Sequence, residues 1–270
     1  MQARTIIISV SWVLAFLVMC SKEPSVTLDV DFSTKEQWKY NARILINGSV
    51  SANDTSTGYS GMAQCILLGN SHADKPQRLD ITIPSVRLTA DFMDNAEKEN
   101  LKKQIEQLRL EVNLDEGTTS MPDTSNLPTL INGGWGLDKN LAKVLPVLPD
   151  AEVSPGFKWE RNKQASIATS HGDAVTHLFQ AFIVDSIYRS RGDTKASISW
   201  DLSYKVEPIQ ADTAGLLDQL PRGGEGKGHA IINTSENIIE HARIEFEVSS
   251  DNNAEVKIGW KELVELSVAG

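Results

Sequence analysis

The chain has 270 residues, a formal net charge of −10 and a 40% share of hydrophobic residues. This length allows one large domain or two small ones. Because the chain is acidic and has no basic cluster, we do not expect it to bind nucleic acid, where clustered Lys and Arg side chains contact the phosphates.

The N-terminal segment, residues 1–19, predicts a secretory signal peptide. Its only charge is Arg4, and the run from Ile6 to Met19 is apolar apart from Ser9 and Ser11. A basic start before a short apolar run is typical of such signals. As a helix the run would be about 21 Å long, whereas a hydrocarbon core is about 30 Å thick. We therefore interpret it as a removed signal rather than a transmembrane helix.

The cysteine that ends this apolar run, Cys20, is the predicted site of lipid attachment. The stretch Leu17-Val18-Met19-Cys20 resembles the lipobox of bacterial lipoproteins. The resemblance implies that the thiol receives a diacylglyceryl group, that the chain is cut before the cysteine, and that the new amine is acylated. Met19 departs from the small residue of the family, so ordinary signal-peptide cleavage nearby stays open as the alternative.

Such an anchor sets the expected location of the protein. Two or more acyl chains hold a protein stably at a membrane. Ser21 after the cysteine resembles the pattern that favours the outer membrane in Gram-negative lipoproteins. We expect a bacterial cell-envelope protein, lipid-anchored through Cys20 and facing the periplasm or the surface. Residues 20–34 are predicted to be its lipidated tether.

The next part of the chain, residues 35–134, is predicted to be rich in strands. Apolar residues alternate with mostly polar ones, the period of a half-buried strand, at Trp38, Tyr40, Ala42, Ile44 and Ile46. RLDITIPSVRLTADF repeats the alternation, and its Pro84 predicts a bend, bulge or edge. Between them, NGSVSANDTSTGYSG is predicted to be a polar, turn-rich segment.

One helix is predicted within residues 94–110. Asp94 or Asn95 can cap its start, and Leu101, Ile105 and Leu108 share one face. LDKNLAKVLPVLPD predicts a further short helix or turn that ends at its prolines.

The second half, residues 135–270, is again predicted to consist mainly of strands. They fall in SPGFKWERNKQASIATS, DAVTHLFQAFIVDSIYRS, TKASISWDLSYKVEP and AEVKIGWKELVELSV. GKGHAIINTSENIIEHARIEFEVSS is predicted to be a hairpin with the turn Thr-Ser-Glu-Asn. Repeated hairpins predict a mainly β (α+β) fold: a curled antiparallel sheet or open half-barrel, possibly of two similar halves, with one or two short helices.

Three stretches within residues 140–250 carry a resemblance to a known family. They are LPVLPDAEVSPGFKW, KASISWDLSY and the Gly-x-Gly strand with its return strand. They resemble an uncharacterised family of bacterial cell-envelope lipoproteins whose β-rich domain is similar to the half-barrel of lipoprotein carriers. The resemblance implies this fold, and the family supplies no catalytic residues.

Side chains that could do chemistry are scattered along the sequence. Cys65 lies among apolar residues and is predicted to be a small core side chain rather than a reactive thiol. The histidines have no spacing typical of a metal site. The glycines of PRGGEGKGHA match no phosphate-binding loop and are predicted to allow a bulge or a close backbone approach. We therefore predict no catalytic residue, no metal and no cofactor.

Two functions are consistent with these features. The first is a non-catalytic, lipid-anchored envelope protein that binds an apolar ligand or an envelope protein on its curved sheet. The second is a lipid-anchored hydrolase with a dispersed site. An apolar concave surface would favour the binding protein, whereas a pocket joining a His to a Ser or a carboxylate would favour the hydrolase. The sequence favours the binding protein, so we do not expect an enzyme.

Overall fold

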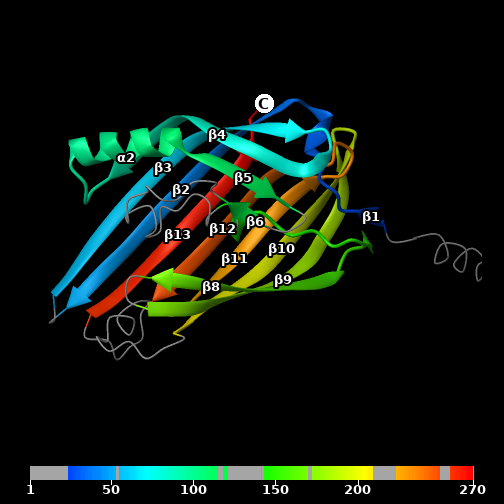
Figure 1. Ribbon diagram of the computed structural model, residues 1–270. Helices are drawn as coiled ribbons and strands as arrows, with labels where there is room; N and C mark the ends of the chain where they lie inside the picture. Colours follow the sequence, from blue (N-terminus) through cyan, green and yellow to red (C-terminus); the bar gives the residue numbers. More distant parts are fainter. Residues whose placement is uncertain are drawn as a thin grey trace, which may run out of the picture.

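Long strands make up most of the structure, a computed structural model (Figure 1). It describes residues 24–52, 55–114, 118–120, 141, 143–169, 172–208, 223–249 and 256–269, so Cys20 and the predicted signal peptide lie outside the described residues. The elements are β1 (Val26–Thr27), η1 (Phe32–Thr34), β2 (Gln37–Ala52), β3 (Thr55–His72), β4 (Lys75–Ala90), α2 (Asn95–Gln107), β5 (Arg109–Asn113), β6 (Thr118–Ser120), β7 (Glu152–Val153), β8 (Lys158–Thr169), β9 (Gly172–Ser190), β10 (Asp193–Pro208), β11 (Gly223–Asn233), β12 (Ile238–Ser249) and β13 (Val256–Val268).

Eleven of the described strands form one antiparallel sheet in the order β6-β5-β4-β3-β2-β13-β12-β11-β10-β9-β8. The strands from β2 to β6 and those from β8 to β13 each pair in chain order, and the two runs meet at the centre, where β2 pairs with the last strand, β13. Within the described residues the two outermost strands, β6 and β8, are not paired with each other, so the sheet is open. The predicted mainly β fold with an open, curled antiparallel sheet is confirmed.

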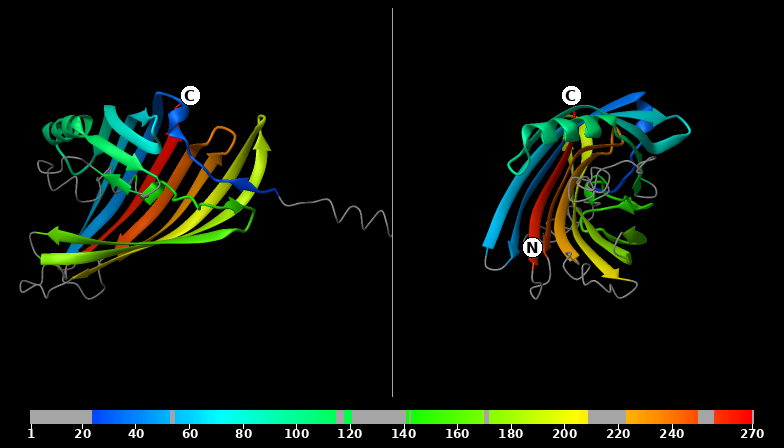
Figure 2. Two further views of the ribbon diagram at one scale, coloured as in Figure 1. Left: turned by 45° about the vertical axis from the view of Figure 1, so that its right-hand side comes forward. Right: turned by 60° about the vertical axis from the view of Figure 1, so that its left-hand side comes forward.

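The two faces of the sheet differ in burial. The sheet is curled, and α2 and the β1–β7 pair lie on its hollow side (Figure 2). On this side, called the inner face, alternate strand residues form one buried apolar cluster with α2 and the segment around Val144. The predicted alternation of β2 is confirmed, because Trp38, Tyr40, Ala42, Ile44 and Ile46 are all buried.

The predicted helix is confirmed as α2, which begins after Asp94. The Asp94 carboxylate accepts from the Glu97 N–H at 2.8 Å, and the Glu97 carboxylate accepts from the Asp94 N–H at 2.8 Å. This reciprocal pair is a capping box, which satisfies two amide donors at the helix start. Leu101 and Ile105 are buried against the sheet.

The N-terminal segment joins the fold within the part predicted to be a tether. Val26 and Thr27 pair with Val153 and Glu152, and the Asp31 N–H donates to the Asn237 carbonyl at 2.8 Å. Leu28, Val30 and Phe32 alternate along this segment and are buried. Of residues 20–34, the described part from Val26 onward is therefore packed against the sheet.

The hairpin of β2 and β3 shows that most of the polar, turn-rich stretch NGSVSANDTSTGYSG is strand. β2 continues to Ala52 and β3 begins at Thr55, with register partners along their full length. The ladder with β13 also extends to Ala52. Ser and Thr accept strand geometry when backbone partners are present on both sides, so tertiary pairing overrides the turn propensity.

The irregularity predicted at Pro84 and the turn predicted at Thr-Ser-Glu-Asn are both confirmed. The β3–β4 register shifts between Ile66 and Leu68, opposite the residues that flank Pro84. A proline has no N–H for the ladder, which explains a bulge at this position. Residues 234–237 form the turn between β11 and β12, where Asn237 has φ 54°.

Glycines in β11 make room for aromatic rings on the inner face. A Cβ on Gly228 would lie 1.9 Å from Cε2 of Trp200, and a Cβ on Gly226 would lie 2.8 Å from the Phe246 ring. The rings therefore lie directly over the backbone of β11. Of the two roles predicted for these glycines, the structure shows the close approach: side chains lie against the backbone of β11, which continues as a regular strand at these positions.

Candidate functional site

Cross-strand neighbours on the inner face form three parallel rows, which differ in exposure. The first, the closed row, crosses the sheet from β8 to β3 and consists of Trp159, Phe182, Trp200, Gly228, Ile244, Val264, Ile44 and Ala63. The Trp159 and Phe182 rings are stacked at 5.0 Å, and Phe182 lies 5.6 Å from Trp200. Most of this row is buried, so it belongs to the core.

The middle row contains both apolar residues and the charged residues Arg161 and Glu262. It consists of Arg161, Gln180, Leu202, Gly226, Phe246, Glu262, Ile46 and Gly61. The side chain of Glu262 is 1% exposed, and Lys143 Nζ lies 2.9 Å from its Oε2. Its Oε1 accepts from Trp260 Nε1 at 2.9 Å. Lys143 Nζ also lies 4.5 Å from the centre of the Phe246 ring. This ion pair fastens the segment that carries Lys143 to the inner face.

A second polar contact of the middle row lies near the edge strand β8. Arg161 Nη1 donates to Oε1 of the fully buried Gln180 at 3.4 Å. Burial lowers the pKa of Arg161 from its ordinary value. Among the residues that the structure describes, Gln180 Nε2 has no hydrogen-bond partner. A buried amide donor without an acceptor is costly, and the described core has two further such groups, the Tyr40 hydroxyl and Trp200 Nε1.

The third row, called the open row, is where the inner face reaches solvent. It consists of Lys163, Leu178, Tyr204, Gly224, Val248, Trp260, Gly48 and Tyr59. Leu178, Tyr204, Trp260 and Tyr59 are only partly buried. Next to the row along β2, Val50 is 38% exposed. The inner face thus opens toward the strand ends that lie away from the β11–β12 turn.

The tyrosines of the open row keep their hydroxyl protons. Burial raises the pKa of Tyr59, and the negative charge of Glu262 raises it further. Burial also raises the pKa of Tyr204. At neutral pH the row therefore presents neutral aromatic side chains that can contact an apolar molecule.

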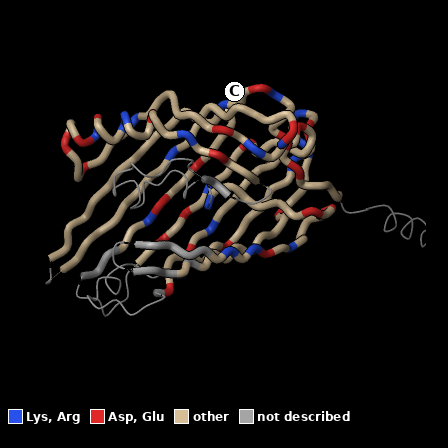
Figure 3. The backbone as a smooth tube through the Cα atoms, in the orientation of Figure 1, with Lys and Arg blue, Asp and Glu red and all other residues tan. Residues whose placement is uncertain are grey.

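A groove of about 1300 Å³ lies near the same strand ends and is lined mostly by positions of the opposite, outer face, together with Leu202, Tyr204, Phe246 and Glu262 of the middle and open rows. Among the side chains that line it are Phe179, Ser203, Glu247 and Lys261, each the chain neighbour of an inner-face residue. Lys261 Nζ lies 2.9 Å from Glu247 Oε2. Acidic and basic positions are interspersed along the strands (Figure 3). Their interspersed charges are typical of a solvated sheet face.

The outer face also brings a serine, a histidine and an aspartate together. Ser197 Oγ lies 2.9 Å from His229 Nε2 and 3.4 Å from Asp185 Oδ2. In a catalytic triad the carboxylate orients the histidine, which then takes the proton of the serine. Here Asp185 accepts from Ser197, so the carboxylate contacts the nucleophile. Asp185 also accepts from Ser199 Oγ at 2.8 Å, and none of its described contacts is with His229, so this carboxylate does not orient the histidine.

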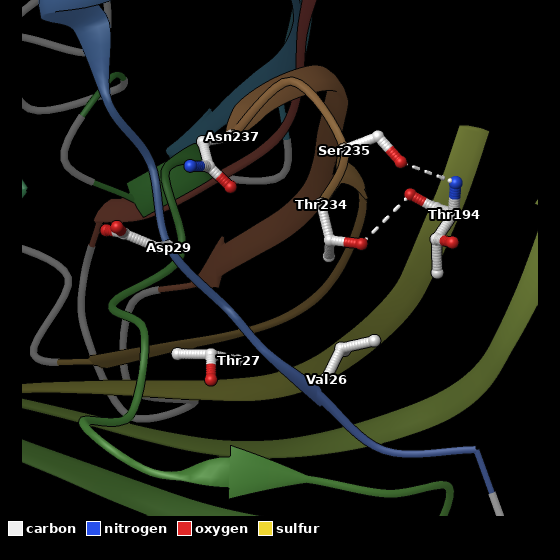
Figure 4. A pocket seen from close by; sticks show the side chains of 7 residues that line it. All are labelled: Val26, Thr27, Asp29, Thr194, Thr234, Ser235 and Asn237. Carbon is white, nitrogen blue, oxygen red and sulfur yellow. Dashed lines mark hydrogen bonds between the residues drawn. The ribbon is translucent and has the colours of Figure 1, made fainter.

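A small polar cavity of about 410 Å³ lies where the N-terminal segment crosses two hairpin turns (Figure 4). Thr234 Oγ1 donates to the Thr194 carbonyl at 3.0 Å, and the Thr194 N–H donates to Ser235 Oγ at 2.9 Å. These bonds tie the two turns together. The polar groups drawn there stabilise the turns, and we assign no ligand to this cavity. Its lining consists of Val26, Thr27, Asp29, Thr194, Thr234, Ser235 and Asn237.

Several sequence predictions concern single residues. Cys65 is buried in β3, and burial raises the pKa of its thiol to about 12, as expected for a core side chain. Cys20, the predicted lipid site, lies outside the described residues. The described parts of the chain contain no group of three or more His, Cys, Asp or Glu residues placed to hold a metal ion. Within the same parts, no helix is long and apolar enough to span a bilayer.

The sequence did not single out Arg161, Gln180 or Glu262. Glu262 occupies a position where β13 otherwise places Val264 and Leu266 toward the core, and Gln180 interrupts the inner-face pattern of β9 in the same way. Each of these polar residues stands at a position where the strand's alternation calls for an apolar residue, and this departure from the pattern could have identified them in the sequence.

No protein-family model matches the chain, and no curated protein sequence matches it. The solved structure of lipovitellin, described for its lipid–protein interactions, is similar at 10% identity and a TM-score of 0.49, covering 87% of this chain and 25% of that chain. The chain thus spans a quarter of the length of the lipovitellin chain. A DUF1329 family protein from Desulfovibrio piger has 7% identity and a TM-score of 0.14, with 87% and 85% of the two chains covered. OpdL from Pseudomonas aeruginosa has 6% identity and a TM-score of 0.20, with 87% and 99% covered. TM-scores below 0.5 support no inference about function.

Proposed function

We propose that the protein is a non-catalytic, lipid-anchored envelope protein that holds an apolar ligand on the inner face of its sheet. The observation that carries this proposal is the open row. Its partly buried Leu178, Tyr204, Trp260 and Tyr59 continue the apolar core out to solvent. Contact with an apolar molecule would remove this surface from water, worth about 25 cal/mol per Å².

The glycines of the open row let aromatic side chains lie flat against the sheet. The Tyr59 ring lies over Gly48, where a Cβ would come within 2.3 Å of its Cζ, and the Phe246 ring lies over Gly224, where a Cβ would come within 2.6 Å of its Cζ. These rings extend the apolar surface of the inner face toward its open end.

Replacing Tyr204 by Asp is expected to weaken the binding of an apolar probe by about tenfold or more. The substitution places a carboxylate on the apolar surface, and desolvating that charge costs at least about 1.4 kcal/mol. The measurement is a fluorescence titration of the full-length protein with N-phenyl-1-naphthylamine, which carries no charge. Circular dichroism and thermal unfolding check that each variant is folded.

The matched control is Ser203→Asp, which adds the same carboxylate to the neighbouring residue on the outer face. It should leave the affinity for the probe unchanged. Equal weakening by both variants would place the probe elsewhere. If the probe does not bind saturably to the wild type, the proposal of an apolar ligand is wrong. The alternative is then that the inner face binds an envelope protein.

The hydrolase alternative rests on the contact between Ser197 and His229. We propose that this pair is structural, since Asp185 contacts the serine and the order of a triad is not assembled. A hydrolase screen of the wild type beside Ser197→Ala tests this. Turnover that is lost in Ser197→Ala would establish the enzyme and remove the non-catalytic proposal.

We also propose that the chain is anchored through lipid on Cys20. Metabolic labelling with a palmitate analogue is expected to mark the wild type and to be lost in Cys20→Ser. The measurement is in-gel detection of the label after expression in a bacterial host. Labelling of equal strength in the two proteins would refute the anchor. Met19→Ala should speed processing, because the family has a small residue there.

A further inference from the structure

We propose that the turn end of the sheet lies against the membrane that holds the anchor, so that the open row points away from this membrane and receives its ligand from the aqueous side. The turn end consists of the strand ends that are joined by the turns at residues 191–192 and 234–237. This inference rests on the proposed function, that is, on the anchor at Cys20 and the ligand on the open row. It adds the orientation of the one relative to the other.

The first observation is that the N-terminal segment is fastened to the turn end. Val26 and Thr27 pair with β7, and the Asp31 N–H donates to the carbonyl of Asn237, in the turn between β11 and β12, at 2.8 Å. Val26 and Asn237 both line the small cavity at the two hairpin turns (Figure 4). Between these contacts the side chain of Leu28 is buried. The chain therefore enters the fold at a fixed place, which is the turn end.

The second observation is the short distance between the anchor and the fold. Val26 follows Cys20 by six positions, and an extended chain spans at most about 3.5 Å per residue, so the two lie within about 21 Å of each other. Were all of residues 20–34 a free tether, Lys35 could lie about 52 Å from Cys20, and either end of the sheet could reach the bilayer. The packing of the segment from Val26 onward therefore holds the turn end close to the anchored acyl chains.

The third observation is the position of the open row at the other end of the strands. Thr194 lines the same cavity as Val26, and Tyr204 of the open row follows it by ten positions along β10. Ten strand residues span about 33 Å. The open row would touch the anchoring bilayer only if the tether were stretched and the strands lay down against the surface, which costs conformational freedom of the chain. With the strands upright, the apolar side chains of the open row face the aqueous compartment.

The test uses the lipidated protein, purified from a bacterial host and reconstituted in phosphatidylcholine vesicles. A maleimide dye reports on the turn end in Glu236→Cys and on the open end in the matched variant Lys205→Cys, because both side chains are exposed. In the lipidated protein the thiol of Cys20 is bonded to lipid. Cys65 is buried, and burial raises the pKa of its thiol to about 12, so only the new cysteine takes the dye.

A phospholipid with a nitroxide on its headgroup quenches dyes that lie close to the bilayer surface. The dye at position 236 is expected to lose most of its fluorescence in vesicles that contain this lipid. The dye at position 205 should keep its fluorescence, because Lys205 pairs with Gly223, ten positions or about 33 Å from the end of β11 at Asn233. Equal quenching of the two dyes, or stronger quenching at position 205, would contradict the orientation.

Lengthening the tether tests whether its short reach sets the orientation. An insertion of about twenty Gly and Ser residues between Ser21 and Lys22 adds a flexible coil outside the described fold. In this variant the two dyes should be quenched to similar extents. A diazirine fatty alcohol dissolved in the bilayer should also give more adducts on Tyr204 than in the wild type. Equal adducts in the two proteins would show that the open row takes its ligand from the anchoring bilayer, which contradicts the inference.

Two controls separate this inference from the proposed function. If the maleimide dye couples to the wild type at Cys20, the thiol is free and the anchor of the proposed function is wrong, and the orientation falls with it. If N-phenyl-1-naphthylamine does not bind saturably to the wild type or to the lengthened protein, the apolar ligand is wrong. The two dyes then still decide which end of the sheet faces the bilayer.

Discussion

Replacing Gly228 by Ala is expected to lower the free energy of unfolding by about 3 kcal/mol. The new Cβ would lie 1.9 Å from Cε2 and 2.2 Å from Cζ2 of Trp200, which is 2% exposed and packed beside Phe182. The indole would have to leave its position in the closed row, and overpacking a core costs about 1–3 kcal/mol, occasionally more. Urea unfolding followed by circular dichroism measures the change.

Gly58→Ala is the matched control for this prediction. Gly58 also lies in a long central strand, but the nearest atom to its added Cβ would be 3.8 Å away. The control should change the free energy of unfolding by no more than about 0.5 kcal/mol. If Gly228→Ala and Gly58→Ala lower the free energy of unfolding equally, the placement of Trp200 over β11 is wrong, and so is the register of the closed row.

The second large effect is expected from Lys143→Met, which should cost about 3 kcal/mol. The Glu262 carboxylate is 1% exposed, and without Lys143 it keeps only the hydrogen bond from Trp260 among those described. Breaking a buried ion pair by removing one partner costs about 3–5 kcal/mol, because an uncompensated charge stays behind. Urea unfolding at neutral pH measures this loss.

The double variant Lys143→Met/Glu262→Leu separates the ion pair from other contacts of the lysine. Removing both charges should restore most of the lost stability, since apolar replacements of a buried pair are often neutral. A double variant that is no more stable than Lys143→Met alone would show that the pair does not fasten this segment to the sheet.

Much of the fold could be predicted because the alternation of apolar residues survives in most strands. The buried residues of β2, the helix α2 and the turn at residues 234–237 follow from local patterns. The polar hairpin tip after Gly48 could not be predicted in this way. Its residues are strands because they pair with β13, which lies about two hundred residues away in the chain, and local propensity does not report such pairing.

The candidate site depends on the same long-range register. The open row exists because Tyr204, Trp260 and Tyr59, which lie on three separate strands, are brought level across the sheet. The alternation in the sequence predicts that each side chain points to the inner face, but it does not predict which residues lie beside it on the neighbouring strands. The pairing of Arg161 with Gln180 likewise required the β8–β9 register. The two classes of function could be stated from the sequence, whereas the surface that distinguishes them could not.

The central claim is that an apolar ligand lies on the open row of the inner face, and photo-cross-linking tests it most directly. The full-length protein is irradiated with a fatty alcohol that carries a diazirine on its chain, and the modified residues are mapped by tandem mass spectrometry. We expect adducts on Leu178, Tyr204, Val248 and Trp260, which share the open row. Adducts on their chain neighbours Phe179, Ser203, Glu247 and Lys261, which occupy outer-face positions of the same strands, would contradict the account.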